Sequence, residues 1–167
     1  GGGTLSADYT ADWREYYQLS SRTLLAARVF GGYSNGNLSN LYYFGGLNTL
    51  RGYEFRSIVG NRAFFGNFEF RFPFIDVLAT PFLTFQQIRG ELFFDIGAAN
   101  YNGINLDTGG PFKFIKGGRL QDGKAAVGYG VSFDFLGLEL HWDFAKRYDL
   151  KVTDGKFRTS FWIGQTF

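Results

Sequence analysis

The feature that most constrains this chain is a strict alternation of side chains in the stretch RAFFGNFEFRFPF, residues 62–74. Successive side chains of a β-strand point to opposite faces, so every second residue shares a face. In a strand, one face of this stretch carries Phe64, Gly66, Phe68, Phe70, Phe72 and Phe74. The other face carries Ala63, Phe65, Asn67, Glu69, Arg71 and Pro73. The stretch therefore predicts a strand with one aromatic face and one mainly polar face.

Similar alternation recurs along the chain and predicts an all-β, antiparallel fold of about seven strands. The expected strands are at about residues 3–12, 21–33, 62–74, 88–100, 124–136, 137–147 and 156–167. Strands of this length exceed the ~5 to 6 residues usual in soluble proteins. They suit a tilted strand that crosses a membrane, which needs about 9 to 11 residues.

Two environments explain an apolar strand face. In a soluble β-sandwich or a lipocalin-like barrel it is a protein core, which mixes large and small aliphatic side chains. A face built almost entirely of phenylalanine instead favours contact with lipid, and hydrocarbon tolerates no open sheet edge, so such strands close into a barrel. We expect residues 1–167 to form one transmembrane β-barrel segment in the bacterial outer membrane. Its surroundings would be outer-membrane lipids and lipopolysaccharide.

The composition argues against two other classes. The chain has 21 Phe, 10 Tyr and 24 Gly, yet its mean hydropathy is −0.13, because apolar and polar residues alternate. No window approaches the ~20 apolar residues of a membrane-spanning helix. The 17 basic and 15 acidic residues are scattered and leave a net charge of +2. Nothing therefore indicates a nucleic-acid partner.

The expected connections differ in length between the two ends of the sheet. The longer ones are residues 33–61, 101–122 and 147–156, and the shorter ones are 12–21, 75–87 and 136–137. This asymmetry is typical of outer-membrane barrels, which have an even number of strands in bacterial single-chain proteins. Seven is odd, so either the chain is the C-terminal part of a larger barrel or a further strand lies in residues 41–46 or 78–86. We favour the larger barrel.

Four short motifs follow one another in the chain. Leu50-Arg51-Gly52-Tyr53 lies in the long loop after Gly45-Gly46. Gly66-Asn67-Phe68-Glu69, Phe93-Phe94-Asp95-Ile96-Gly97 and the C-terminal FWIGQTF, residues 161–167, lie in expected strands. In this order they resemble the BamA and TamA outer-membrane assembly-factor superfamily, also called bacterial surface antigen barrels. The resemblance covers nearly the whole chain and implies the last seven strands of a sixteen-stranded barrel. Barrels that follow a TolB-like propeller are the most similar.

The resemblance also implies a docking site for the long loop, at about residues 34–61, inside the barrel lumen. The residues implied are Arg51, Gly52 and Tyr53 in the loop, and Glu69, Phe93 and Asp95 on the wall. Side-chain alternation independently places the three wall residues on the polar, inward face. A guanidinium offers a fixed fork to a carboxylate and stacks on an aromatic ring, which lysine does not reproduce. The alternative is an exposed arginine in a surface turn.

The C-terminal run resembles the signal strand that assembly machinery recognises by strand addition. The residues that carry this resemblance are Phe161, Ile163, Gly164 and Phe167. Gln165 departs from the pattern, because an aromatic residue is common at its position in outer-membrane proteins.

Three patterns invite a catalytic or ligand-binding interpretation and have simpler explanations. His141 shares a face with Glu139 and Asp143, which is more typical of lumen polarity than of a metal site. Glu69 and Glu91 lack an accompanying nucleophile, so ion pairing explains them better than acid–base catalysis. The glycines at 128 and 130 lie inside a strand and not at a strand-to-helix turn, which excludes a dinucleotide site. We expect no enzyme, no catalytic residue, no metal and no cofactor.

Two functions fit these patterns. The resemblance implies a factor for assembly, insertion or translocation of outer-membrane proteins, with client proteins and assembly-machinery subunits as partners. The alternative is an outer-membrane channel or structural barrel without insertase activity. The region that precedes the barrel discriminates between them, because POTRA repeats favour assembly and a propeller does not.

Overall fold

The computed structural model describes residues 5–79, 81, 84–135 and 137–164. Its main element is a seven-stranded antiparallel sheet in the order β1-β2-β5-β6-β9-β10-β11. The bounds are β1 Ser6–Ser20, β2 Thr23–Gly36, β5 Arg62–Ala79, β6 Thr84–Asn100, β9 Lys124–Phe135, β10 Leu138–Arg147 and β11 Arg158–Ile163. The prediction of an all-β, antiparallel fold with about seven strands is confirmed.

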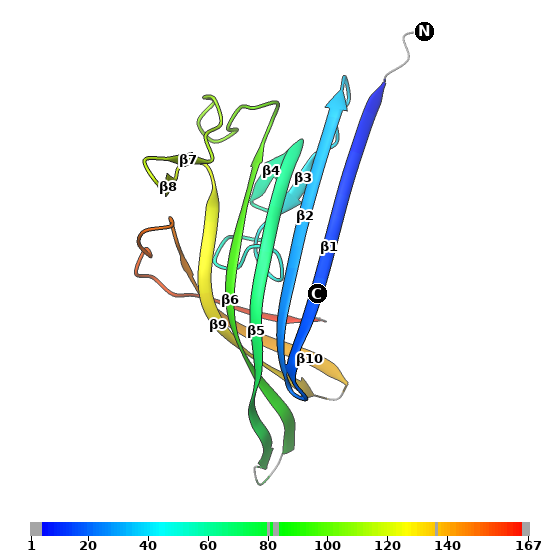
Figure 1. Ribbon diagram of the computed structural model, residues 1–167, viewed down its shortest axis with the longest axis vertical. Helices are drawn as coiled ribbons and strands as arrows, with labels where there is room; N and C mark the ends of the chain where they lie inside the picture. The colour runs from blue at the N-terminus through cyan, green and yellow to red at the C-terminus, as the bar shows by residue number, and fades with distance from the viewer. Residues whose placement is uncertain (1–4, 80, 82–83, 136, 165–167) are drawn as a thin grey trace.

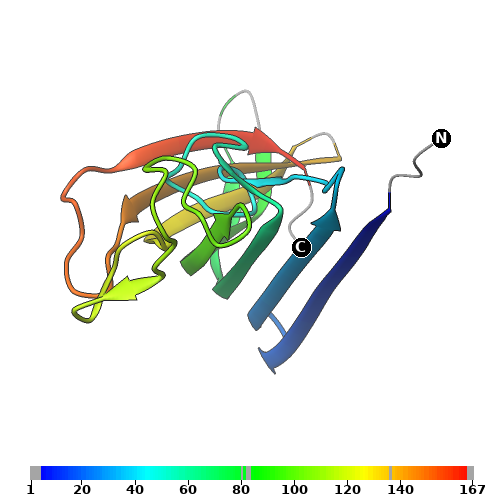
Figure 2. The same cartoon turned by 90° about the horizontal axis from the view of Figure 1, so that it is seen from above.

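The sheet is strongly curved and open between β1 and β11, which do not pair (Figures 1 and 2). Two small hairpins interrupt the sequence of strands: β3 Tyr42–Phe44 pairs with β4 Ile58–Gly60, and β7 Ile115–Lys116 pairs with β8 Arg119–Leu120. Seen from above, the segment with β3 and β4 lies on the concave side of the sheet (Figure 2). The long connections therefore gather at one end, and one of them folds back along the inner wall.

Three expected boundaries were wrong. β1 continues to Ser20, β5 continues to Ala79 and β6 begins at Thr84, so the segments 12–21 and 75–87 are mostly strand. The connections at this end are therefore shorter than expected. Neither candidate for a further strand joins the main sheet as one. Residues 78–79 end β5 and residues 84–86 begin β6, and among the described residues β3 pairs with β4 alone.

The two faces of the sheet have the reverse of the usual polarity. On β5 the side chains of Phe64 and Phe68 are 41% and 46% exposed, whereas Asn67 and Glu69 are 0% and 3% exposed. In the part of the chain that the structure describes, no helix packs on the aromatic side, and the ring of Phe114 from a loop lies 5.3 Å from the ring of Phe64, between centroids. We call this side the convex face and the polar side the concave face.

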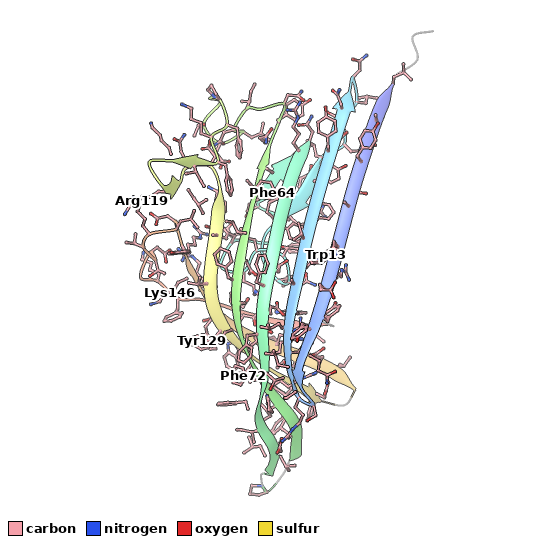
Figure 3. The ribbon with its side chains drawn as sticks, in the orientation of Figure 1. Trp13, Phe64, Phe72, Arg119, Tyr129 and Lys146 are labelled. Carbon is pink, nitrogen blue, oxygen red and sulfur yellow. The ribbon has the colours of Figure 1, made fainter. Side chains whose placement is uncertain are left out.

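Figure 3 shows the convex face, where the labelled Trp13 of β1, Phe64 and Phe72 of β5 and Tyr129 of β9 project outward. An apolar face turned to the outside and a polar face turned inward are opposite to what a water-soluble sheet requires. None of the described residues forms a helix long and apolar enough to cross a membrane.

A compact apolar cluster fixes the folded-back loop against the concave face. Phe44, Leu50 and Ile58 from the loop pack on Ala63 and Phe65 of β5. Leu50 is completely buried. The residue that follows it, Arg51, is thereby held against the inner wall.

Candidate functional site: the Arg51 loop on the inner wall

The segment 45–55, which we call the Arg51 loop, is shaped by a tight turn. Gly45 and Gly46 have φ angles of +120° and +70°, a region that favours glycine. The Gly46 amide donates to the carbonyl of Leu50 over 2.8 Å, and the Thr49 hydroxyl donates to the carbonyl of Gly46 over 2.8 Å. The turn presents Arg51 to the wall at a fixed place.

Arg51 forms hydrogen bonds to Asp95 of β6 through both its side chain and its backbone. Its Nε and Nη2 donate to the two carboxylate oxygens over 2.8 Å each, and its backbone N–H donates to Oδ2 over 2.9 Å. Parallel bonds from a guanidinium fork to a carboxylate are among the strong hydrogen bonds in proteins. Asn67 of β5 adds a further bond to Asp95, of 2.8 Å from Nδ2 to Oδ1.

Two more carboxylates complete the surroundings of the guanidinium. Nη2 lies 2.8 Å from Oε1 of Glu69, and Nη1 lies 2.8 Å from Oε1 of Glu91. Arg51 is 1% exposed, so burial acts to lower its pKa, but the charges of Asp95, Glu69 and Glu91 outweigh burial and raise the pKa above its ordinary value. The group therefore stays charged. Arg71 shares the excess negative charge by pairing with Glu69 at 2.5 Å.

The Phe93 ring supports the guanidinium from below, with Cζ of Arg51 3.6 Å from the ring centroid. The ring in turn lies close to β9 because Gly128 has no side chain: a Cβ there would overlap with the ring and with the carbonyl oxygen of Phe144 on β10. Gly130 makes similar room for the carboxylates of Glu91 and Asp143. Gly128 and Gly130, which resemble part of a dinucleotide-binding motif in the sequence, are therefore explained by close packing on the inner wall.

Gly52 and Tyr53 extend the contact to the next two strands. Gly52 has a φ of +80°, and a Cβ on it would lie 3.0 Å from Cβ of Ala145 on β10. Its carbonyl accepts a 2.9 Å bond from Nε of Arg147. Tyr53 donates its hydroxyl to the carbonyl of Ala125 over 3.1 Å, and Cζ of Arg147 lies 4.3 Å from its ring centroid.

The structure thus brings together all six residues that the resemblance implied: Arg51, Gly52, Tyr53, Glu69, Phe93 and Asp95. Two contributors were missed, namely Glu91 as a third carboxylate and Arg147 as the partner of Gly52 and Tyr53. Alternation placed Glu91 on the inward face, but only the position of the loop decides which acids reach the guanidinium.

A second polar cluster lies on the inner face of β10 and β11. The rings of His141 and Trp162 stack at 3.9 Å between centroids with an angle of 9°, and Nε1 of Trp162 donates to Asp143 over 2.8 Å. His141 lies 3.6 Å from Glu139 and Asp143 turns to Trp162, so the three do not converge. Among the described residues no group of His, Asp and Glu is arranged to hold a metal ion.

The C-terminal strand places its apolar residues outward. Phe161 and Ile163 are more than half exposed on the convex face, while Trp162 between them is buried on the concave face. The Gly164 N–H donates to the carbonyl of Glu139 over 3.1 Å and prolongs the pairing with β10. Phe167 lies outside the described residues, as does Gln165.

The fold is an open, curved antiparallel sheet with an aromatic convex face, a charged concave face and a loop bound on its concave side. The chain matches the Omp85 superfamily domain over residues 1–167, and it belongs to this superfamily. The resemblance inferred from the motifs is confirmed at this level. Omp85 proteins are outer-membrane β-barrel proteins, non-enzymatic factors of protein assembly or transport. No curated protein matched the chain.

Proposed function

We propose that this chain is the C-terminal part of an outer-membrane β-barrel that inserts or translocates other outer-membrane proteins. In this proposal the Arg51 loop lies in the barrel lumen and braces the wall. The observation that carries it is Arg51 itself: a loop arginine that is 1% exposed and paired with three carboxylates from β5 and β6. Burying so much charge is costly unless every group is paired, which argues for a defined position of the loop.

The contacts of the loop suggest what it braces. Arg51 joins β5 and β6, while Gly52 and Tyr53 reach β9 and β10, so one short segment connects four consecutive strands. β11 has no hydrogen bond or ion pair to the loop among the described residues, and it is held by pairing with β10 and by Trp162. The loop thus stabilises β5, β6, β9 and β10 but not the edge strand β11. This difference suits a barrel whose edge strand pairs with a strand of a client protein.

The reversed polarity of the sheet supports a membrane location. An exposed face rich in Phe, Tyr and Trp is stable in contact with hydrocarbon and is a liability in water. The bacterial outer membrane, its lipids and the client proteins of the assembly pathway are the surroundings that the proposal implies. An open channel is disfavoured, because the Arg51 loop and the β3–β4 hairpin occupy the concave side.

The function is tested with the full-length protein in liposomes that receive an unfolded client barrel. We expect the protein to accelerate client folding, and Arg51→Ala to abolish most of the acceleration while Arg56→Ala leaves it unchanged. Arg56 is the matched control because it belongs to the same loop region but is exposed over the Tyr43 ring. Ion conductance without any acceleration of client folding would contradict the proposal and favour a channel.

A further inference from the structure

Among the described residues of the seven strands, two cations point outward, and both lie at one end of the sheet. By strand alternation, Arg62 on β5 and Lys146 on β10 point outward, and both lie at the end of their strand next to the long connections. Each lies over an aromatic ring: Cζ of Arg62 is 5.2 Å from the Tyr33 ring centroid, and Nζ of Lys146 is 4.2 Å from that of Phe157. Nε of Arg62 has no hydrogen-bond partner.

The surface below Lys146 is aromatic and continuous over β9, β10 and the residue that precedes β11. Tyr129 stacks with Phe144 at 5.2 Å between centroids and meets Phe157 edge-on at 5.8 Å, and Phe144 is 6.0 Å from Trp142. Lysine over such a surface can lay its methylene stem on the rings and lift its ammonium group toward the polar end. The arrangement is that of an amphipathic boundary, with acyl chains on one side and head groups on the other.

The loops above this boundary are basic. Residues 113–124 and 146–158 carry nine basic and three acidic residues. Lys124, Arg147 and Arg158 point to the concave face by strand register, and the six other basic residues against three acidic ones leave a net charge of +3. The two segments are joined, since Lys151 donates its Nζ to the carbonyl of Gly117 over 3.1 Å and Arg119 lies 3.5 Å from Asp149. In Figure 3, Arg119 and Lys146 lie on the same flank of the sheet, above Tyr129.

We propose that this flank binds the phosphate groups of a lipid of the outer leaflet, of the lipopolysaccharide kind. Lys146 and Arg119 would contact the phosphates, and the rings of Tyr129, Phe144 and Phe157 would receive the acyl chains. Charge complementarity selects this occupant: a second protein strand would meet the aromatic surface but would leave the excess of cations unpaired. The inference rests on the proposed membrane location and adds a lipid-binding site to it.

The test uses the full-length protein in nanodiscs of phosphatidylethanolamine that contain either bisphosphorylated lipid A or lipid A without its phosphates. Lipid that remains bound is counted by native mass spectrometry. We expect the bisphosphorylated form to be retained preferentially, and Lys146→Gln and Arg119→Gln each to weaken its retention about fivefold, the effect of one cation near an anionic surface. Arg14→Gln is the control, because this cation lies on the concave face of β1 by alternation and pairs with Asp12.

Each outcome points to a different conclusion. Equal retention of the two forms of lipid A, or equal losses in Lys146→Gln and Arg14→Gln, would overturn the lipid site while leaving the membrane barrel intact. A protein that does not enter the nanodisc at all would contradict the membrane location itself. Heat-dependent mobility in SDS gels verifies that each variant is folded, so a loss of lipid cannot be attributed to unfolding.

Discussion

The guanidinium of Arg51 lies 3.6 Å above the ring of Phe93 while its nitrogens bind three carboxylates. This combination requires a planar cation with several donors in fixed directions, which an ammonium group lacks. Arg51→Lys should therefore fail to replace arginine, and Arg51→Ala should cost about 3 to 5 kcal/mol, the usual loss when a buried ion pair is broken.

The measurement for Arg51 is the temperature at which the barrel loses its compact mobility in SDS gels. Arg56→Lys provides the comparison, because this side chain is exposed in the same loop region. If Arg51→Lys is as stable as the unsubstituted protein, any cation suffices at this position, and the planar guanidinium stacked on Phe93 is not required.

Gly52→Ala tests the close approach of the loop to the wall. A Cβ at Gly52 meets two penalties, a φ of +80° and a distance of 3.0 Å to Cβ of Ala145. Gly155→Ala meets only the first, because its φ is +74° and no atom lies within 4 Å of the added Cβ. The strain of such a φ costs about 1 to 2 kcal/mol. Denaturant unfolding should show a larger loss for Gly52→Ala, and equal losses would mean that the loop does not press on β10.

Gly128→Ala tests the support of the Phe93 ring. The added methyl group overlaps with the backbone carbonyl of Phe144 on β10 and with the Phe93 ring. Both must therefore move, and the displaced ring no longer supports the Arg51 guanidinium. We expect a loss of about 1 to 3 kcal/mol, as for other overpacked sites, together with faster proteolysis within residues 37–61. Gly31→Ala, in strand β2 with no atom near the added Cβ, should change neither property. Unchanged proteolysis of Gly128→Ala would indicate that the ring does not position the loop.

Trp162→Phe tests how β11 is held. Phenylalanine keeps a ring to stack on His141 but removes the 2.8 Å bond to Asp143, whose Oδ1 already lacks a partner. Leaving a buried carboxylate without its donor costs about 1 to 3 kcal/mol. Hydrogen exchange of the β11 amides should accelerate, whereas Trp142→Phe on the convex face should leave it unchanged. If both substitutions act alike, the bond to Asp143 does not hold the strand.

The alternation of side chains predicted the two faces of the sheet because burial follows strand parity. It failed at the lower part of β1, where residues 13–18, WREYYQ, are polar or amphipathic on both faces. The backbone nevertheless stays paired with β2 there, from Trp13 with Val29 to Gln18 with Leu24. The backbone hydrogen bonds between strands do not depend on the alternation of apolar and polar side chains, so a strand can extend beyond the residues that show this alternation.

The candidate site was less accessible to sequence reasoning. Parity placed Glu69, Glu91 and Asp95 on one face, but the partner of a loop residue depends on how the loop folds over long range. Only the resemblance linked Arg51 to Asp95. The roles of Gly128 and Gly130 depend on cross-strand register, which pairs them with Phe93 and Glu91, and a single sequence does not supply that register.

The most direct test of the account is the environment of the convex face. Nitroxide labels at Leu92→Cys and Phe161→Cys, both outward, are compared with labels at Ser132→Cys and Ser160→Cys on the concave face, in the full-length protein in liposomes. The account predicts that the outward labels collide mainly with oxygen dissolved in lipid and the inward labels do not. Outward labels that collide mainly with a water-soluble nickel reagent would contradict it.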